Sequence, residues 1–213
     1  MRSTTTAARL RANGFNEPEL RELKRLSKPS LVQRFLDDEL GYNKEPHGPT
    51  CRSPRRVLRD RVAQCMEGAL VAAAALEANG YPALLMDLEA TRDDDHVLAV
   101  FRQDGCWGAV AKSNYSGLRF REPVYRTLRE LAISYFEHYY NPRGEKTLRR
   151  YSRPLALKRF DHLGWRTSEE DLWEIPAALC EAVHDSLLTP KQAKGLSRMD
   201  RRLYEAGRVG AAL

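Results

Sequence analysis

The most regular hydrophobic pattern in the chain lies between Ser53 and Gly80. Ser53-Pro54 is typical of a helix start, with serine as the N-cap and proline at the first helical position, and Asn79-Gly80 is typical of a helix end. Between them, the apolar residues that recur at helical spacing are Val57, Leu58, Val62, Cys65, Met66, Ala69, Leu70, Ala73 and Leu76. The pattern predicts helical structure that either runs unbroken or is interrupted at Arg61 to Gln64, so that Cys65 begins a new helix.

After Gly80 the hydrophobic period shortens to that of β-strands. Three short apolar runs follow, at Pro82–Glu89, His96–Arg102 and Cys106–Lys112. Asp104-Gly105, between the second and third runs, is typical of a tight hairpin turn. A helix followed by a three-stranded antiparallel meander predicts an α+β fold in which the helix packs on one face of a small sheet.

Helical patterns flank this core on both sides. Before it, one helix is expected from Glu17 to about Lys28, and Ser30 is expected to cap a second. After it, we expect a helix from Pro123 to Tyr140 and a last helix that starts at Pro176. The chain therefore divides into a helical extension (1–50), a core (51–140) and a basic, partly helical extension (141–213).

The composition is that of a soluble globular protein. The 213 residues are 42% hydrophobic and 30% charged, and no apolar run reaches the length of a membrane span. The segment Met1–Arg11 lacks the apolar core of a secretory signal, which favours a cytoplasmic location. It is also rich in arginine, serine and threonine, with no acidic residue before Glu17, and an organellar transit peptide has the same composition.

The net charge of +6 is concentrated in two stretches. Arg143–Arg159 carries seven basic residues against Glu145, and Lys191–Arg208 carries six against Asp200 and Glu205. Such stretches suit nucleic acid or an acidic protein partner. They lack interleaved aromatic residues and any nucleic-acid-binding motif, so we expect a solvated basic face and no nucleic acid partner.

The four cysteines, at positions 51, 65, 106 and 180, form no CxxC pair. Without a secretory signal they are expected to be free thiols in a reducing compartment. His47 lies four residues before Cys51, but two ligands are too few for a metal site, and no cofactor-binding motif occurs. The sequence predicts neither a metal nor a cofactor.

The strongest chemical suggestion is the ordered set of Cys65, His96 and Asn114, which come from separate predicted elements. A thiol attacks a carbonyl carbon as a thiolate, which a helix N-terminus and a neighbouring imidazole both favour. An Asn amide oxygen can hold the imidazole in its useful tautomer. Gln64 and the backbone N–H of Cys65 are candidates to bind the oxyanion. Each residue also has an ordinary structural interpretation, since buried cysteine is common on apolar helix faces.

The order and placement of these residues resemble the transglutaminase-like superfamily, which includes transglutaminases, arylamine N-acetyltransferases and bacterial transglutaminase-like cysteine proteinases. The resemblance covers about residues 54 to 125. It rests on Gln64-Cys-Met-Glu-Gly-Ala, on Glu77-Ala-Asn-Gly-Tyr-Pro-Ala, on Asp95-His-Val-Leu-Ala-Val and on Gly105-Cys-Trp. It implies a papain-like core and an acyl-transfer or amide-hydrolysis reaction through Cys65 and His96, on a peptide or another amide-containing substrate.

The sequence departs from the family pattern at one position. The family usually carries an Asp four residues after the tryptophan, and here that residue is Ala111. Asn114 is the preferred replacement, although strict strand alternation places Ser113, and not Asn114, on the face of Trp107. The missing acid leaves a rival hypothesis open, namely a transglutaminase-like fold that has lost catalysis and binds a protein or an acidic partner.

Overall fold

The computed structural model describes residues 14–211, so the segment 1–11 interpreted above lies outside the described part of the chain. The α-helices are α2 (Glu17–Arg25), α3 (Pro29–Asp38), α4 (Pro54–Asp60), α5 (Cys65–Ala78), α6 (Leu128–Ile133), α7 (Glu174–Cys180), α8 (Pro190–Lys194) and α9 (Arg201–Gly207). The 3-10 helices are η1 (Ser116–Leu118), η2 (Phe136–His138) and η3 (Leu157–Leu163). The strands are β1 (Gly41–Tyr42), β2 (Val62–Ala63), β3 (Leu84–Ala90), β4 (His96–Gln103), β5 (Cys106–Val110), β6 (Arg121–Tyr125), β7 (Leu148–Ser152), β8 (Leu155–Ala156) and β9 (His184–Ser186).

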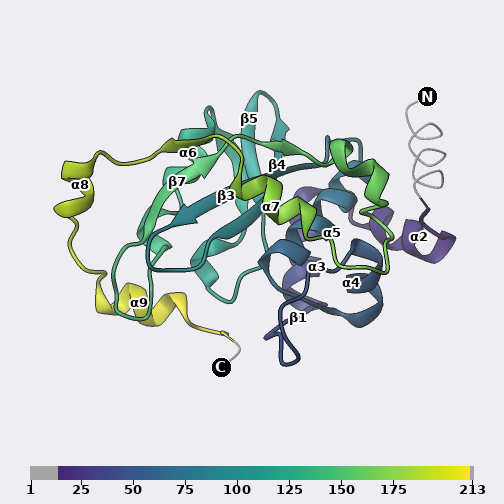
Figure 1. The fold of residues 1–213 in the computed structure, drawn as a ribbon, viewed down its shortest axis with the longest axis horizontal. Helices are drawn as coiled ribbons and strands as arrows, with labels where there is room; N and C mark the ends of the chain where they lie inside the picture. Colours follow the sequence, from purple (N-terminus) through teal and green to yellow (C-terminus); the bar gives the residue numbers. More distant parts are fainter. Residues whose placement is uncertain (1–13, 212–213) are drawn as a thin grey trace.

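The predicted α+β class is confirmed, and the predicted meander forms the centre of a seven-stranded antiparallel sheet. The strand order is β6-β5-β4-β3-β7-β9, and β8 also pairs with β3. Helices α2 to α5 gather on one side of the sheet, whereas α8 and α9 lie at the opposite end of the molecule (Figure 1). The basic segment after residue 140 therefore contributes three strands to the sheet as well as helices.

Each face of the sheet packs against its own hydrophobic core. On one face, Leu85, Val97 and Phe101 pack with the helices α2 to α5. On the other face, Leu98 and Val100 pack with residues of α6 and the segment after it. Helix α5 is buried along its whole length after Cys65, which explains its alanine-rich sequence, because small side chains let neighbouring elements approach from every side.

The helical pattern between Ser53 and Gly80 is interrupted, as one of the two predicted alternatives requires. Ser53 caps α4 by accepting a hydrogen bond from the backbone N–H of Arg56. Helix α4 ends at Arg61, whose φ of 57° is the left-handed conformation that closes many helices. Val62 and Ala63 then form strand β2, and Cys65 is the first residue of α5.

Two helix predictions after the central meander are wrong. The region Pro123 to Tyr140 is not one helix, because Arg121–Tyr125 forms the edge strand β6 and only Leu128–Ile133 is α-helical. An edge strand accepts proline, which has no N–H to donate to a neighbour. The last helix does not start at Pro176, because α7 begins at Glu174 and two further helices follow.

None of the helices in residues 14–211 is both long enough and apolar enough to cross a membrane.

Helix α5 approaches the strand exit at Lys112 so closely that Gly68 is required there. A Cβ atom at position 68 would lie 2.3 Å from the Cβ of Lys112. The Lys112 Nζ is fixed in turn by the carbonyl oxygens of Leu36 (2.5 Å) and Leu40 (2.6 Å), where α3 ends. Gly68 therefore sets the distance between the helix that carries Cys65 and the segment Lys112–Asn114.

We expect Gly68→Ala to lower the free energy of unfolding by about 1–3 kcal/mol, because overpacking outweighs the roughly 1 kcal/mol gain in helix propensity. Urea unfolding followed by circular dichroism measures the change. Gly195→Ala is the control, since its nearest contact would be an ordinary 3.6 Å. A Gly68→Ala variant as stable as the wild type would contradict the close approach.

Candidate active site

Cys65 lies in a pocket of about 560 Å³ at the N-terminus of α5. The pocket is also lined by every other residue that the sequence suggested for the site: Gln64, His96, Ser113 and Asn114. The Cys65 side chain is partly exposed there, whereas His96 is buried. The structure therefore brings the candidate nucleophile and the candidate base into one cavity.

The position of the thiol follows from the register of the sheet. Asp87 lies opposite Val97, and the backbone N–H of Asp87 donates to Oγ of Ser152 on β7, on the side away from β4. Asp87 and Val97 are therefore a non-hydrogen-bonded pair, and the N–H of Val97 points toward β5. Pairing of β4 with β5 ends where Ala99 meets Val110. The Val97 N–H is thus free of the ladder and lies near enough to the Cys65 thiol to lower its pKa.

The His96 ring is held by a backbone carbonyl. Its Nε2 lies 2.8 Å from the carbonyl oxygen of Leu118, in the 3-10 helix η1. A carbonyl oxygen can only accept, so Nε2 carries the hydrogen and Nδ1 is the basic nitrogen of the neutral ring. His96 is the first residue of β4, next to Val97, and its ring and the Cys65 thiol line the same pocket.

Both groups are uncharged at neutral pH. Burial lowers the pKa of His96 to about 4, although the hydrogen bond to Leu118 opposes this shift. Burial raises the pKa of the Cys65 thiol to about 11; hydrogen bonds from the backbone of Val97 and Met66 lower it, and the charges of Asp87 and Asp94 raise it further. The resting pocket therefore holds an uncharged thiol and a neutral imidazole, so His96 would have to take the proton during the attack.

The residues proposed as third member have other structural roles. Asn114 lines the pocket, but the acceptor at Nε2 of His96 is Leu118. Ser113 closes a turn, in which its Oγ accepts from the backbone N–H of Tyr115 (3.0 Å). Ala111 has both backbone groups bonded to the side chain of Gln33, at 3.0 Å each. Ala111, at the position where the family pattern carries an acid, thus has an apolar side chain and a backbone fixed by Gln33 directly after the end of β5.

Gln64 is the N-cap of α5, and its side chain is fully engaged. Its Oε1 accepts from the backbone N–H of Met66 (2.5 Å), and its Nε2 donates to the carbonyl oxygen of Thr50 (3.1 Å). The backbone N–H of Cys65 has no acceptor among residues 14–211, as expected at the first position of a helix. This N–H is consequently the better oxyanion donor of the two.

Tyr42 is a pocket residue that the sequence did not suggest. It sits on β1, which pairs with β2 directly before Gln64. Burial raises the pKa of Tyr42 to about 12, and a charge on Cys65 would raise it further, so its ring lies near the thiol. Its hydroxyl has no partner in the described part of the chain and is a second donor available for an oxyanion.

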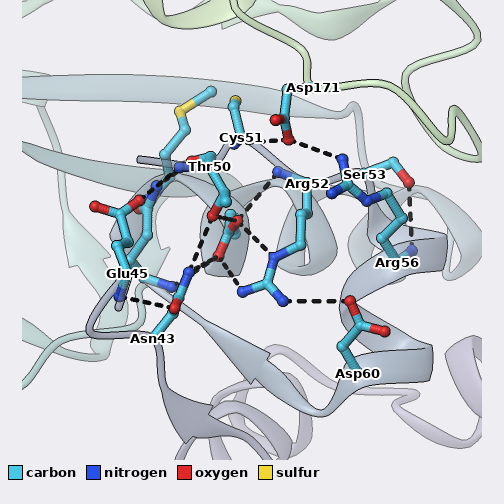
Figure 2. A network of polar contacts seen from close by, with 12 residues as sticks. Asn43, Glu45, Thr50, Cys51, Arg52, Ser53, Arg56, Asp60 and Asp171 are labelled. Carbon is cyan, nitrogen blue, oxygen red and sulfur yellow. Dashed lines mark hydrogen bonds and ion pairs between the residues drawn. The ribbon is translucent and has the colours of Figure 1, made fainter. Parts of the chain in front are cut away.

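Glu67 anchors the loop before α4 to the start of α5. Its carboxylate is fully buried and accepts hydrogen bonds from Thr50 Oγ1 (2.6 Å), from Arg52 Nε (2.8 Å) and from the backbone N–H groups of Arg52 and Gln64 (3.1 Å each). Figure 2 shows the network around it, which extends through Arg52 to Asp60 on α4. The carboxylate therefore fixes the turn from which Cys65 projects.

A second buried histidine lies outside the residues that line the pocket. Nε2 of His184 on β9 is 3.0 Å from Oδ2 of Asp87, and its Nδ1 is 2.7 Å from the carbonyl oxygen of Ala182. Burial raises the pKa of Asp87 to about 6. Both ring nitrogens of His184 are bonded, so it has no free nitrogen to act as a base.

The other three cysteines are free thiols without a base beside them in the described structure. Cys51 is buried, its pKa is raised to about 12 by burial, and its thiol lies 3.6 Å from the carbonyl oxygen of Leu172. Cys180 is exposed and Cys106 is partly exposed. In residues 14–211, no group of three His, Cys, Asp or Glu side chains is arranged to hold a metal ion.

No family model matches the sequence, and no curated protein shows significant similarity to it.

The geometry makes a prediction about His96 that NMR can test. We expect ¹⁵N chemical shifts of the Nε2–H tautomer, with protonation of the ring only near pH 4, because burial disfavours the imidazolium. A pH titration of ¹⁵N-histidine-labelled protein measures both. A Nδ1–H tautomer would show that the ring is not bound to Leu118, and titration near the ordinary value of 6.5 would show that the ring is not buried.

We expect Glu67→Gln to lower the free energy of unfolding by about 3 kcal/mol at pH 7, because it leaves the buried Arg52 without its counter-charge. The control is Glu89→Gln, which removes an exposed ion pair with Arg150 and should cost under about 1 kcal/mol.

The deficit of Glu67→Gln should also depend on pH. Burial alone would raise the pKa of Glu67, but hydrogen bonds from Arg52, Thr50 and two backbone N–H groups hold it below 4.5. The stabilisation is thus complete above the unfolded-state pKa and is lost as the pH falls through the lower folded-state pKa. Denaturant unfolding of the wild type and of Glu67→Gln from pH 7 to pH 3 measures the difference in their free energies of unfolding. A difference that stayed constant with pH would show that the charge of Glu67 is not the source of the stabilisation.

Proposed function

We propose that the protein catalyses acyl transfer or amide hydrolysis through a thioester on Cys65, with His96 as the base. The observation that carries this proposal is the arrangement of the two groups. The thiol and the ring line one pocket, the Val97 N–H next to His96 lowers the pKa of the thiol, and Leu118 occupies the Nε2 of the ring and leaves Nδ1 as its basic nitrogen. A nucleophile, an oriented base and a free N–H at a helix start are the parts that such chemistry needs.

The fold supports a transglutaminase-like, papain-type core as part of this proposal. Cys65 begins a buried helix, His96 begins the central strand β4, and β5 continues the antiparallel meander. This is the order of elements on which the resemblance in the sequence rests. The core is here extended by strands β7, β8 and β9 on the far side of β3.

The reaction would begin with transfer of the thiol proton to Nδ1 of His96 while the sulfur bonds to the carbonyl carbon of the substrate. The negative charge moves to the carbonyl oxygen, where the N–H of Cys65 and the hydroxyl of Tyr42 are available donors. Nδ1 then returns the proton to the leaving amine, and a thioester remains. Water or another acceptor, deprotonated by Nδ1, releases the acyl group and restores the thiol.

Hydrolysis of a peptide or another amide is the favoured form of this reaction, because water is always present as an acceptor. The carbonyl of Leu118 stabilises an imidazolium less than a carboxylate would, since it carries no full charge. Reaction with an unactivated amide is therefore expected to be slower than with an activated ester.

A second candidate function is a binding module that has lost catalysis. The observation in its favour is that Ala111 replaces the usual acid and that Cys65 and His96 are both uncharged at neutral pH. In that case the pocket would hold a segment of a protein partner, and Cys65 would line the pocket without reacting.

Acylation of the cysteines separates the two functions. With p-nitrophenyl acetate at pH 7.5, we expect Cys65 to be acetylated faster than the exposed Cys180, because His96 removes its proton during the attack. His96→Gln should slow acetylation of Cys65 about 100-fold, the usual contribution of a general base. Peptide mapping by mass spectrometry at several time points measures each site separately.

His96→Gln is a suitable variant because the glutamine amide can still donate to the carbonyl of Leu118, and thermal unfolding checks that the fold is kept. If Cys65 reacts no faster than Cys180, or if His96→Gln leaves its rate unchanged, the enzymatic proposal is wrong and the binding module is favoured.

A further inference from the structure

The two basic stretches of the sequence meet in space around a small pocket of about 190 Å³. The first stretch contributes Lys146 and Arg149, and the second contributes Arg198, from the segment between α8 and α9. Arg92, from the turn between β3 and β4, completes the basic lining. Four cationic side chains and Glu145, from three separate segments, therefore line one cavity. Helices α8 and α9, which flank the segment of Arg198, lie at one end of the molecule (Figure 1).

Backbone contacts hold these segments together. The N–H of Met199 donates to the carbonyl oxygen of Gly144 (2.9 Å), and Nη1 of Arg198 donates to the carbonyl oxygen of Arg143 (2.8 Å). The N–H of Thr91 donates to the carbonyl oxygen of Thr147 (3.0 Å). These hydrogen bonds thus hold the segments that line the pocket in fixed positions relative to one another.

The positive charge in the pocket is only partly neutralised. Glu145 lies 3.3 Å from Arg92, and Glu137 lies 2.5 Å from Lys146. Neither Arg149 nor Arg198 is within ion-pair distance of a carboxylate in residues 14–211. Glu145 also lines the pocket and acts on Arg149 from beyond ion-pair distance, so the cations outnumber the acid and a bound anion would be favoured there.

Arg149 is oriented for such an anion. Its Nη1 donates to the carbonyl oxygens of Lys146 (2.9 Å) and Leu148 (2.8 Å), which fixes the plane of the guanidinium. Its Nε and Nη2 have no acceptor in the described part of the chain. Burial and the neighbouring charge of Arg92 both lower the pKa of Arg149, and the charge of Glu145 opposes them only in part. The free edge of this fixed group matches the two-oxygen geometry that arginine uses to bind phosphate.

We propose that this pocket binds a phosphate monoester. A dianionic phosphate balances the two unpaired arginines, its oxygens accept from the free edge of Arg149, and the hydroxyl of Ser197 also lines the cavity. A cavity of this size accommodates the phosphate group of a small ester. The site is separate from the Cys65 pocket and does not depend on the function proposed for it.

The proposal is tested by titrating ¹⁵N-labelled protein with inorganic phosphate and with O-phosphoserine, at pH 7.5 and constant ionic strength set with sodium chloride. We expect saturable shifts of the Arg149 Nε–H signal and of the Ser197 and Arg198 amides. Arg149→Met should weaken phosphoserine binding at least about tenfold, as the loss of a bidentate charged contact implies. Arg198→Met, which removes an exposed side chain, tests the same site if Arg149→Met unfolds.

The matched control is Arg150→Met. Arg150 is the next residue on β7, pairs with Glu89 and does not line the pocket, so its loss changes the net charge equally without touching the site. The proposal is supported if binding is saturable, if Arg149→Met or Arg198→Met weakens it, and if Arg150→Met preserves it. This holds whether the protein binds the ester alone or inorganic phosphate as well. Absence of saturation at tens of millimolar, or equal weakening by Arg150→Met, overturns it. A Cys65→Ser variant should bind phosphoserine like the wild type.

Discussion

The buried carboxylate of Glu67 is the constraint on which the candidate site depends. Burying a charge is costly unless it is paired and hydrogen-bonded, and here Arg52, Thr50 and two backbone N–H groups satisfy it. These partners come from the loop before α4 and from the N-cap of α5, so they meet only when α4 has ended and α5 begins at Cys65. The left-handed residue Arg61 costs about 1–2 kcal/mol and is maintained because the network beyond it requires the break.

The same arrangement explains how a histidine is oriented without an acid beside it. The side chain of Gln33 occupies both backbone groups of Ala111, so the chain leaves the sheet one residue after β5 ends. This departure frees the Val97 N–H for the thiol and carries the chain through η1, where Leu118 reaches His96. A carbonyl selects the tautomer as well as a carboxylate does, but it does not supply the charge that stabilises an imidazolium. The site is therefore well oriented and weakly activated.

Residue order and periodicity were sufficient to predict the central features of this fold. The change from helical to strand spacing after Gly80 gave the meander, and the order of Cys65 and His96 placed both in one pocket. The role of Leu118 was not predictable, because a backbone carbonyl has no side-chain signature. Glu67 left a weak signal as the glutamate at the third position of a helix that begins at Cys65. Strands β7 and β9 were missed because they are short and contain charged residues, and because only some of the residues in each strand are buried.

The turn between β3 and β4 separates two pockets of opposite character. Asp93, Asp94 and Asp95 line the thiol pocket, whereas Arg92, immediately before them, lines the basic one. The left-handed conformation of Arg92 (φ 57°) reverses the chain direction between the two sides. Asp94 on this turn adds to the rise in the pKa of the Cys65 thiol, for which burial is the main cause. Arg92 on the same turn lowers the pKa of Arg149, for which burial is again the main cause. One turn therefore places charges of opposite sign at the two pockets, where each adds to the effect of burial on the group that the pocket holds.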